Sequence, residues 1–174
     1  MEEVYQVRYL SYKNAGLIAE RDDAVMKDEF DETPFATTIL AIAGNRLAGT
    51  IRVIEDTKTL GLPVDQEGFA PYLWPLRQRR RKIVEVGRYC FLPEYQNKSK
   101  KILAKICLQA LNTSIEKGAN DIVVEVASHH ASFYKRIFKA KPLFSFHSVR
   151  YGRKSVGLRM NLDDYTGQLR FPNP

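Results

Sequence analysis

The ten residues Lys82–Phe91, KIVEVGRYCF, decide the fold because they combine a buried β-strand with residues that a regular strand disfavours. Half of the residues are β-branched or aromatic, which is typical of strands. Glu85 and Arg88 are nevertheless charged, and Gly87 is a poor strand former. A glycine inside a strand often marks a β-bulge, where one strand carries an extra residue. The stretch therefore predicts a bulge at Val86–Gly87.

Such a bulge changes the direction in which the two charged side chains point. In a regular strand, residues three positions apart lie on opposite faces. One extra residue would bring Glu85 and Arg88 to the same side and leave backbone N–H groups available to a developing oxyanion. A structural ion pair on a half-exposed strand explains the same residues, so the stretch alone leaves both interpretations open.

The flanking sequence predicts an alternation of helices and strands. Residues 56–81 are rich in proline and glycine and predict a long, partly irregular connection, and residues 20–34 predict a loop with some helix. We expect one α/β domain over residues 1–174, with a mixed central sheet flanked by helices. The expected elements are a helix over 2–15, a hairpin over 37–56, a helix over 98–117 that ends at Gly118, a strand over 121–127, a short helix over 129–139 capped by Ser128, and paired strands over 144–151 and 155–162.

The composition limits the classes of function. Of the 174 residues, 44% are hydrophobic and 27% charged, and no apolar run reaches the length of a membrane span. The N-terminus does not read as a signal peptide, and Cys90 and Cys107 lie in apolar stretches, so we expect reduced thiols and a cytoplasmic protein. Three histidines without ligand spacing predict no metal site. The net charge of +7 predicts an acidic partner: nucleic acid, a membrane surface or an acidic protein.

Other charged residues precede the bulged strand and could converge on it. Arg8 lies on the first predicted helix, one turn before Tyr12. Asp28 and Asp31 flank Phe30 in KDEFDE, and Arg52 lies on the strand that precedes the bulged one. Each of these residues taken singly is a plausible surface charge.

Taken together, these residues form four short motifs: VRYLSYKNAG (7–16), KDEFDET (27–33), GTIRV (49–53) and EVGRY (85–89). Their order and spacing resemble those of acyl-homoserine-lactone synthases, and still more closely those of the related N-acyl amino acid synthases. A later stretch, SHHASFYKRIFKAKPL (128–143), also has a counterpart in the second group. The resemblance spans roughly residues 4–162, and its specificity lies in the ordered combination of motifs.

The resemblance implies a GNAT-type acyltransferase fold and the transfer of an acyl group from a thioester to an amine. Within the implied site, Glu85 is the expected base, acting directly or through water. Arg52 or Arg88 would hold the carboxylate of an amino acid, while Asp28 and Asp31 either contact the substrate or only order their loop. The polar set implied by matching positions is Arg8, Asp28, Asp31, Arg52, Glu85 and Arg88, with Tyr12, Gly87 and His130 as further substrate contacts.

Tyr134 has two interpretations of equal weight. By resemblance to GNAT enzymes, it lies on the helix whose tyrosine protonates the leaving thiolate. It is equally explained as a tyrosine packed between helix and sheet. The apolar residues of the 58–81 connection likewise either line a pocket for a long acyl chain or pack on the surface.

The loop PEYQNKSKK bears on the identity of the thioester donor. Enzymes of this fold that use CoA carry a glycine-rich loop there, whose amides hold the pyrophosphate. This loop has no glycine, so the expected donor is the 4′-phosphopantetheine of an acidic acyl carrier protein, with no permanently bound cofactor. Its phosphate would meet Lys98, Ser99, Lys100 and Lys101, although a solvated first turn of helix explains the same lysines.

Several functions remain to be distinguished. The leading hypothesis is an N-acyl amino acid synthase. A homoserine-lactone synthase is the alternative, but the tryptophan that those enzymes usually carry after the first helix is missing here, which argues against S-adenosylmethionine as a substrate. A basic module without catalysis is the third, although the chain has no helix-turn-helix or base-stacking signature and we expect no nucleic-acid partner. A protein that binds an acyl ligand without turnover is the fourth.

Overall fold

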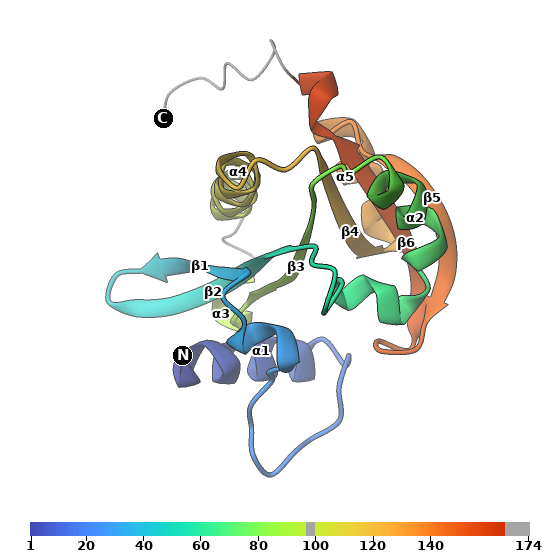
Figure 1. Ribbon diagram of the computed structural model, residues 1–174. Coiled ribbons are helices and arrows are strands. Elements are labelled where there is room, and N and C mark those ends of the chain that lie inside the picture. The colour runs from blue at the N-terminus through green and yellow to red at the C-terminus, as the bar shows by residue number, and fades with distance from the viewer. Residues whose placement is uncertain (97–99, 166–174) are drawn as a thin grey trace.

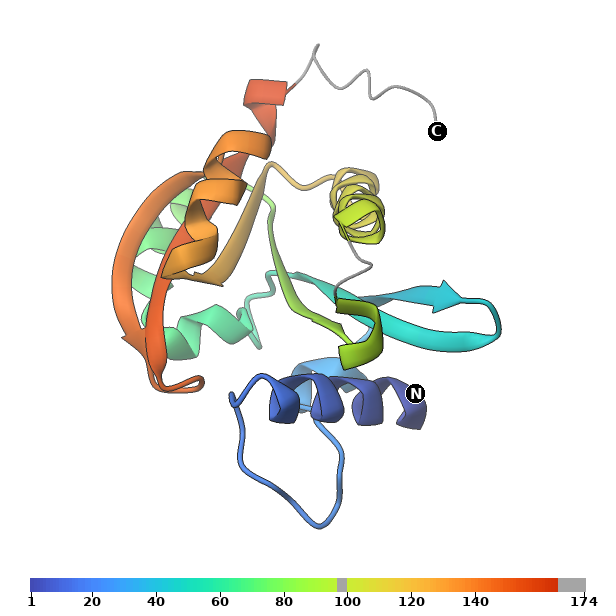
Figure 2. The ribbon, with the colours of Figure 1, turned by 180° about the vertical axis from the view of Figure 1, so that it is seen from behind.

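The computed structural model describes residues 1–96 and 100–165. Its centre is a mixed sheet of six strands in the order β1-β2-β3-β4-β6-β5. The β1–β2 hairpin forms one end of the molecule and the β5–β6 hairpin the other (Figure 2). The strands are β1 Ala36–Ala43, β2 Arg46–Glu55, β3 Ile83–Phe91, β4 Asp121–Ala127, β5 Lys141–Ser148 and β6 Arg153–Asn161.

The sheet separates along its middle. Strands β3 and β4 are the one parallel pair among the described strands, and their register runs from Ile83–Asp121 to Glu85–Val123. Beyond Glu85 the two strands no longer pair, and Figure 1 shows them diverging. The other neighbouring strands are antiparallel. The sheet is therefore open between β3 and β4 at the level where the EVGRY motif begins.

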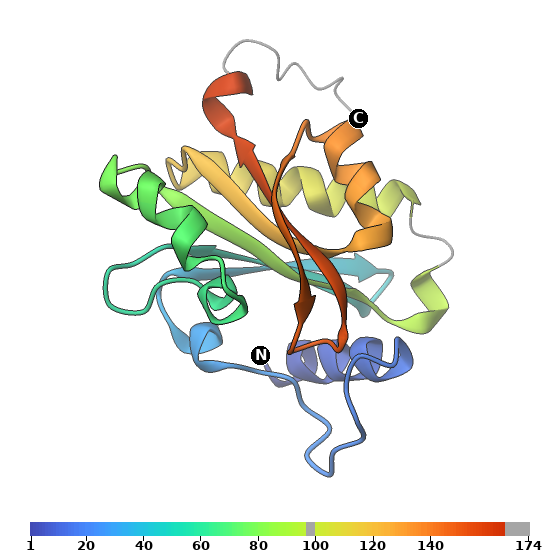
Figure 3. The same cartoon turned by 90° about the vertical axis from the view of Figure 1, so that its right-hand side faces the viewer.

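Helices cover both faces of this sheet. Side chains of α4 and α5 pack on one face with Val84, Val124 and Val126 of the central strands. Side chains of α1 and α2 pack on the other face, in two clusters that include Ile83, Val123 and Cys90. Figure 3 shows α1 on the opposite side of the sheet from α4 and α5. The α-helices are α1 Glu2–Asn14, α2 Ala70–Gln78, α3 Pro93–Gln96, α4 Lys100–Glu116 and α5 Ala131–Ile137, and the 3-10 helices are η1 Glu29–Glu32, η2 Pro63–Glu67, η3 Ser128–His130 and η4 Leu162–Tyr165.

The predicted α/β class, a mixed central sheet flanked by helices, is confirmed, and the differences are local. Residues 56–81 contain η2 and α2, because Pro71 lies at the start of a helix, where proline is tolerated. Ser128 is the first residue of η3 and not a cap: the N-cap of η3 is Ala127, and that of α5 is His130. Strand β5 begins at Lys141 rather than residue 144, and the turn to β6 falls at 149–152.

The buried apolar residues of the 58–81 connection fill a core rather than line a pocket, whereas Leu60, Tyr72 and Trp74 are exposed at the surface. Phe69 is fully buried, and its ring packs edge-on against Phe144, with centroids 4.9 Å apart. Leu62 and Leu73 belong to the same cluster, which covers the α2 face of the sheet. None of these side chains lines the cavity at the centre of the sheet. The suggestion that this connection forms the acyl pocket is therefore corrected.

The predicted bulge exists, but two positions further along β3. Gly87 pairs with Arg52 and Cys90 pairs with Thr50, so Arg88 and Tyr89 together lie opposite a single residue of β2. The residue with a left-handed backbone is Arg88, at φ +53°, and not Gly87. A side chain that finds stabilising partners can hold this less favourable conformation. The bulge still brings Glu85 and Arg88 to the same face, as expected.

No helix of the described residues combines the length and the apolar character needed to cross a membrane.

Candidate active site

A cavity occupies the opening between β3 and β4. Its apolar part lies under α4 and α5 and includes Cys107, Ala110 and Phe138. Its polar part lies toward α1 and the β5–β6 turn. Because the sheet is open here, the cavity reaches both faces of the sheet. Its polar and aromatic lining consists of Tyr12, Glu85, Arg88, Tyr89, Glu125, His130, Tyr134, Arg150, Tyr151 and Arg153.

Glu85 lies at the last paired position of β3, where the cavity begins. The residue is 6% exposed, and its Oε2 accepts a hydrogen bond from the Val64 backbone N–H at 2.9 Å. Burial raises the pKa of Glu85 to about 7, although the Val64 N–H and the charge of Arg52 favour the ionised form. A carboxyl group that titrates near neutral pH can both take up and release a proton at pH 7, as a general base must.

Gly87 keeps the space beside this carboxyl group open. A Cβ at position 87 would lie 3.1 Å from Glu85 Oε1, tighter than most Cβ contacts. Gly87 itself lines the cavity. The glycine of EVGRY therefore gives room to the second oxygen of Glu85, while the left-handed conformation belongs to Arg88.

Arg88 carries a guanidinium group at the edge of the cavity. The residue is 8% exposed, and its Nη2 donates to Asp28 Oδ2 at 2.5 Å. Its Nη1 contacts Met26 Sδ at 3.9 Å, and its buried Nε has no partner among the described residues. Arg88 forms its ion pair with Asp28 and not with Glu85, so the structural Glu85–Arg88 pair considered from the sequence is replaced by an Arg88–Asp28 pair.

Behind Arg88 lies a network of the other motif residues. Arg52 donates to both oxygens of Asp28, at 2.6 and 3.0 Å, and lies 2.6 Å from Asp31 Oδ1. Arg8, fully buried, donates to Asp31 Oδ1 at 2.7 Å. The two aspartates also form a capping box around η1. This network connects α1, η1, β2 and β3, but Arg8, Asp28, Asp31 and Arg52 do not line the cavity.

Opposite charges in this network stabilise the ionised form of its carboxyl and guanidinium groups. Burial alone would raise the pKa of Asp28, but hydrogen bonds from Arg52 and the charges of Arg52 and Arg88 outweigh it and hold that pKa well below its usual range. The observed contacts give Asp28 and Asp31 the loop-ordering role that the sequence left open. Whether they also meet a substrate stays a prediction.

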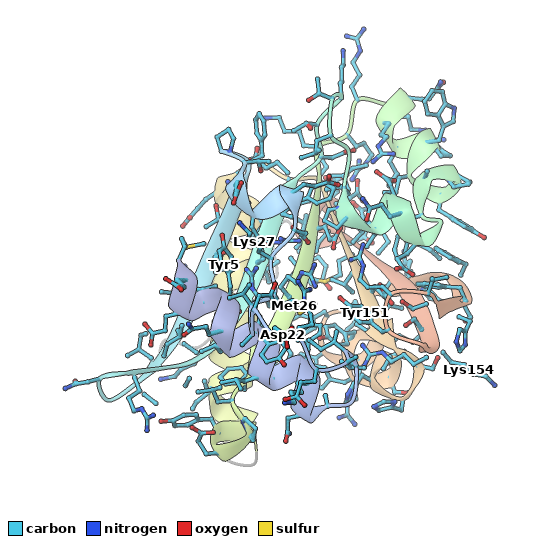
Figure 4. All side chains as sticks on the ribbon, turned by 90° about the horizontal axis from the view of Figure 1, so that it is seen from below. Tyr5, Asp22, Met26, Lys27, Tyr151 and Lys154 are labelled. Atoms are coloured by element: carbon cyan, nitrogen blue, oxygen red, sulfur yellow. The ribbon has the colours of Figure 1, made fainter. Side chains whose placement is uncertain are left out.

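Three further predicted residues lie at the cavity. Burial raises the pKa of Tyr134 well above its usual value, so its hydroxyl group stays protonated at neutral pH. Tyr12 comes from α1 and lies against Tyr151 of the β5–β6 turn, with ring centroids 5.7 Å apart. Met26 and Tyr151 are labelled in Figure 4, which views the molecule from the α1 side. Burial lowers the pKa of His130, so its imidazole is neutral at pH 7.

The predicted phosphate-binding residues fall largely outside the described part of the chain. Lys98 and Ser99 lie in the undescribed segment 97–99. Lys100 and Lys101 begin α4, and only their backbone is described. Among the described residues, no group of three or more His, Cys, Asp or Glu could hold a metal ion.

Sequence reasoning missed four polar residues of the cavity: Glu125, Arg150, Tyr151 and Arg153. Glu125 lies within DIVVEVA, where a single acid interrupts a buried strand, and this interruption was an available signal. Arg150 and Tyr151 belong to the turn between the last two strands, and Arg153 is the first residue of β6. Their approach to the EVGRY motif depends on the sheet order, which places β6 next to β4.

Comparisons with known proteins identify a family whose model matches most of the chain. The family model of FeeM, an N-acyl amino acid synthase, matches residues 3–161. The solved structure of FeeM from uncultured soil microbes superposes with a TM-score of 0.80 at 21% identity, over 95% of this chain and 92% of that one. The CoA-dependent acyl-homoserine lactone synthase BjaI gives 0.64 at 14% identity, over 99% and 82%.

More distant acyltransferases share the fold. An acyl-CoA N-acyltransferase from Pseudomonas aeruginosa gives a TM-score of 0.62 at 13% identity, over 91% of this chain and 87% of that one. No curated protein shows significant sequence similarity to the chain. Because the family model covers most of the sequence and the fold is that of N-acyltransferases, the chain belongs to the FeeM family of N-acyl amino acid synthases.

Proposed function

We propose that the protein transfers a fatty acyl group from an acyl-carrier-protein thioester to the α-amine of an amino acid. One observation carries this proposal: a single cavity joins an apolar compartment to a compartment that holds both carboxyl and guanidinium groups. An acyl chain needs the first compartment. A zwitterion with one carboxylate and one ammonium group is complementary to the second.

Arg88 is the proposed partner of the amino acid carboxylate. Its Nε and Nη1 have no oxygen partner among the described residues, and it borders the cavity. Arg52 is the weaker candidate, because both of its Nη atoms already bind Asp28 and it does not border the cavity. Of the two arginines proposed from the sequence, the contacts thus favour Arg88.

In the proposed reaction, Glu85 acts as the general base and Tyr134 as the general acid. Glu85 accepts one proton from the ammonium group, and the amine then attacks the thioester carbonyl. Backbone amides of the Arg88–Tyr89 bulge stabilise the oxyanion of the tetrahedral intermediate. As the C–S bond breaks, Tyr134 gives its proton to the thiolate, and the second proton of the nitrogen returns through solvent to Tyr134. The products are an amide, a free thiol and a protonated Glu85, which releases its proton to water.

The carrier-protein donor rests on charge and on the sequence of the loop after β3. The net charge of +7 favours an acidic partner, and the loop lacks the glycines that would hold a pyrophosphate. A single phosphate at the start of α4 is compatible with Lys98, Ser99, Lys100 and Lys101. The acyl group arrives and leaves with its carrier, so the proposed reaction needs no permanently bound cofactor.

Reconstitution with purified components tests this function. The protein is incubated with long-chain acyl carrier protein and each of the common amino acids, and release of carrier thiol is measured together with product mass. We expect thiol release only when donor and amino acid are both present, and little with acyl-CoA. Release with S-adenosylmethionine as the acceptor would instead identify a homoserine-lactone synthase.

A protein that bound acyl donors without turnover would release no thiol with any acceptor. Salt-sensitive binding of nucleic acid in the absence of turnover would identify a basic binding module. Either result overturns the proposed function.

A further inference from the structure

Glu125 of β4 places a second carboxyl group at the opening between β3 and β4, across from the EVGRY motif of β3. Its neighbours Val124 and Val126 pack toward α4, whereas Val123 packs toward α2, so Glu125 shares the α2 face with Val123. Glu85 shares that face with Ile83 and pairs with Val123. Glu125 therefore lies two residues past the last β3–β4 pair, on the same face as Glu85 and across the opening. Both residues line the cavity.

The Glu125 carboxyl group lacks a partner for one of its oxygens. Oε1 is buried and has no hydrogen-bond partner among the described residues, and the same holds for the neighbouring Ser155 Oγ. A buried carboxylate oxygen without a donor is costly, and a native structure usually has a reason to keep one. Burial also raises the pKa of Glu125, although the nearby hydroxyl groups of Ser155 and Ser148 and the charge of Arg150 favour its ionised form.

Among the described residues, no ion pair joins the Glu125 carboxyl group to a protein cation. The charged groups around it are Glu67 of η2, which repels it, and Arg150 of the β5–β6 turn. Arg150 is already held by η2: its Nη2 donates to the Pro63 carbonyl at 3.1 Å, and its Nε lies 3.5 Å from Glu67 Oε1. Glu85, Arg88, His130 and Arg153 face the same cavity from the other elements.

We propose that Glu125 binds the ammonium group of the acceptor and so orients the amine toward the thioester, while Glu85 removes its proton. This inference rests on the proposed function and adds a substrate contact to it. An ammonium group carries three N–H donors, and only one of them is given up before attack. The Glu125 carboxylate, across the opening from Glu85, accepts a hydrogen bond from a second N–H donor and keeps the nitrogen in place. After Glu85 has removed one proton, the lone pair of the nitrogen then faces the thioester carbonyl.

The test compares two ligands that differ only in the ammonium group. The first is an amino acid accepted by the wild-type protein in the reconstitution, and the second is its desamino analogue, which keeps the carboxylate and the side chain. Calorimetric titration measures the Kd of each for wild type and for Glu125→Gln. We expect the substitution to raise the Kd of the amino acid at least tenfold and to change the Kd of the analogue less than twofold. The reason is that only the amino acid presents a cation to Glu125.

Glu67→Gln is the matched control. Glu67 is another buried carboxylate of the same region, bound by the Ser148 hydroxyl at 3.0 Å and the Arg150 N–H at 3.2 Å, but it does not line the cavity. Its substitution should change both affinities by the same factor. Glu125→Asp keeps the charge, but its shorter side chain moves the carboxylate away from the ligand, so the affinity for the amino acid should fall selectively here as well. This variant replaces Glu125→Gln in the test if Glu125→Gln does not fold.

Two results would overturn the inference. Equal losses for both ligands in Glu125→Gln would assign Glu125 a role in shaping the cavity, and unchanged affinities would leave it without contact to the acceptor. Both results are obtained with a wild-type protein that turns over, so they are distinct from failure of the proposed function, in which no amino acid supports thiol release.

Discussion

Asp28 and Arg88 form an ion pair although 60 residues separate them in the chain. The pair exists because the bulge turns Arg88 toward the face on which η1 presents Asp28. The same carboxylate binds Arg52 with two hydrogen bonds, so the one aspartate joins two strands. The position of the guanidinium at the cavity therefore depends on a residue that does not border the cavity.

Substitution of Asp28 by Asn should destabilise the protein strongly. The amide cannot balance Arg52 and Arg88, and removal of one partner from a buried ion pair typically costs about 3–5 kcal/mol. Chemical denaturation at pH 7 measures the loss. Because the pKa of Asp28 is depressed, its contribution is present above about pH 4 and declines as the pH falls further.

Asp23→Asn is the control for that loss. Asp23 pairs with Arg21 at 2.7 Å, but both side chains are about half exposed. Pairs of this kind contribute at most about 1 kcal/mol. Equal unfolding midpoints for Asp28→Asn and Asp23→Asn would show that the buried network does not stabilise the fold.

Glu85→Gln should abolish turnover while the fold is kept. In the wild-type protein, kcat should rise with pH through an apparent pKa near 7, because only the ionised carboxylate can accept the proton of the amine. The measurement is the pH profile of carrier-thiol release at saturating substrates. Near-normal turnover in Glu85→Gln would remove Glu85 from the role of base.

The same substitution should raise stability at alkaline pH. Since burial raises the pKa of Glu85 from about 4.3 in the unfolded chain to about 7, the native state holds a proton that the unfolded state has lost between these pH values. Wild-type stability should fall across this window by on the order of 3 kcal/mol. Glutamine does not ionise, so Glu85→Gln should exceed wild type at pH 8 and match it near pH 4. A Tm difference that is the same at both pH values would contradict this.

The substitution Tyr134→Phe distinguishes a role of Tyr134 in protonating the leaving group from a role in packing. If the hydroxyl group protonates the thiolate, its loss should lower kcat by about 10²-fold with acyl carrier protein. An acyl thioester of an acidic thiol has a leaving group that needs no proton, so the loss should shrink with that donor. The assay compares kcat for the two donors. An equal loss with both would indicate a packing role.

Ala110→Leu should shorten the acyl chain that the protein prefers. Ala110 lies on α4, is 1% exposed and borders the apolar part of the cavity, so a larger side chain takes volume from the acyl group. Mass spectrometry of products formed from a mixture of acyl donors measures the preference. Overpacking of this kind costs about 1–3 kcal/mol of stability.

Ala41→Leu provides the comparison for that substitution. Ala41 lies in the same core cluster, on β1, but does not border the cavity. It should lose stability without any change of product length. A shift toward shorter products in Ala41→Leu as well would mean that the preference reflects general destabilisation.

Much of the fold could be predicted from local pattern. The spacing of Val4, Val7, Arg8, Ser11 and Tyr12 predicts a helix with one buried face, and these residues are buried in α1. The β1–β2 hairpin and β4 follow from β-branched runs and turn residues. Strand ends were less well predicted, because pairing with neighbouring strands decides them and local propensity is similar on either side.

Local pattern is enough to identify the chemically unusual residues: an acid, a glycine and a base within one apolar strand, and arginines and aspartates at fixed spacings before it. How these residues are used depends on contacts that form only when the chain folds. The register between β2 and β3 moved the bulge to Arg88, and Asp28 rather than Glu85 became its partner. The sheet order brought Glu125 and the β5–β6 turn to the opening beside Glu85. These relationships join distant segments, so they depend on strand pairing and burial that no local pattern encodes.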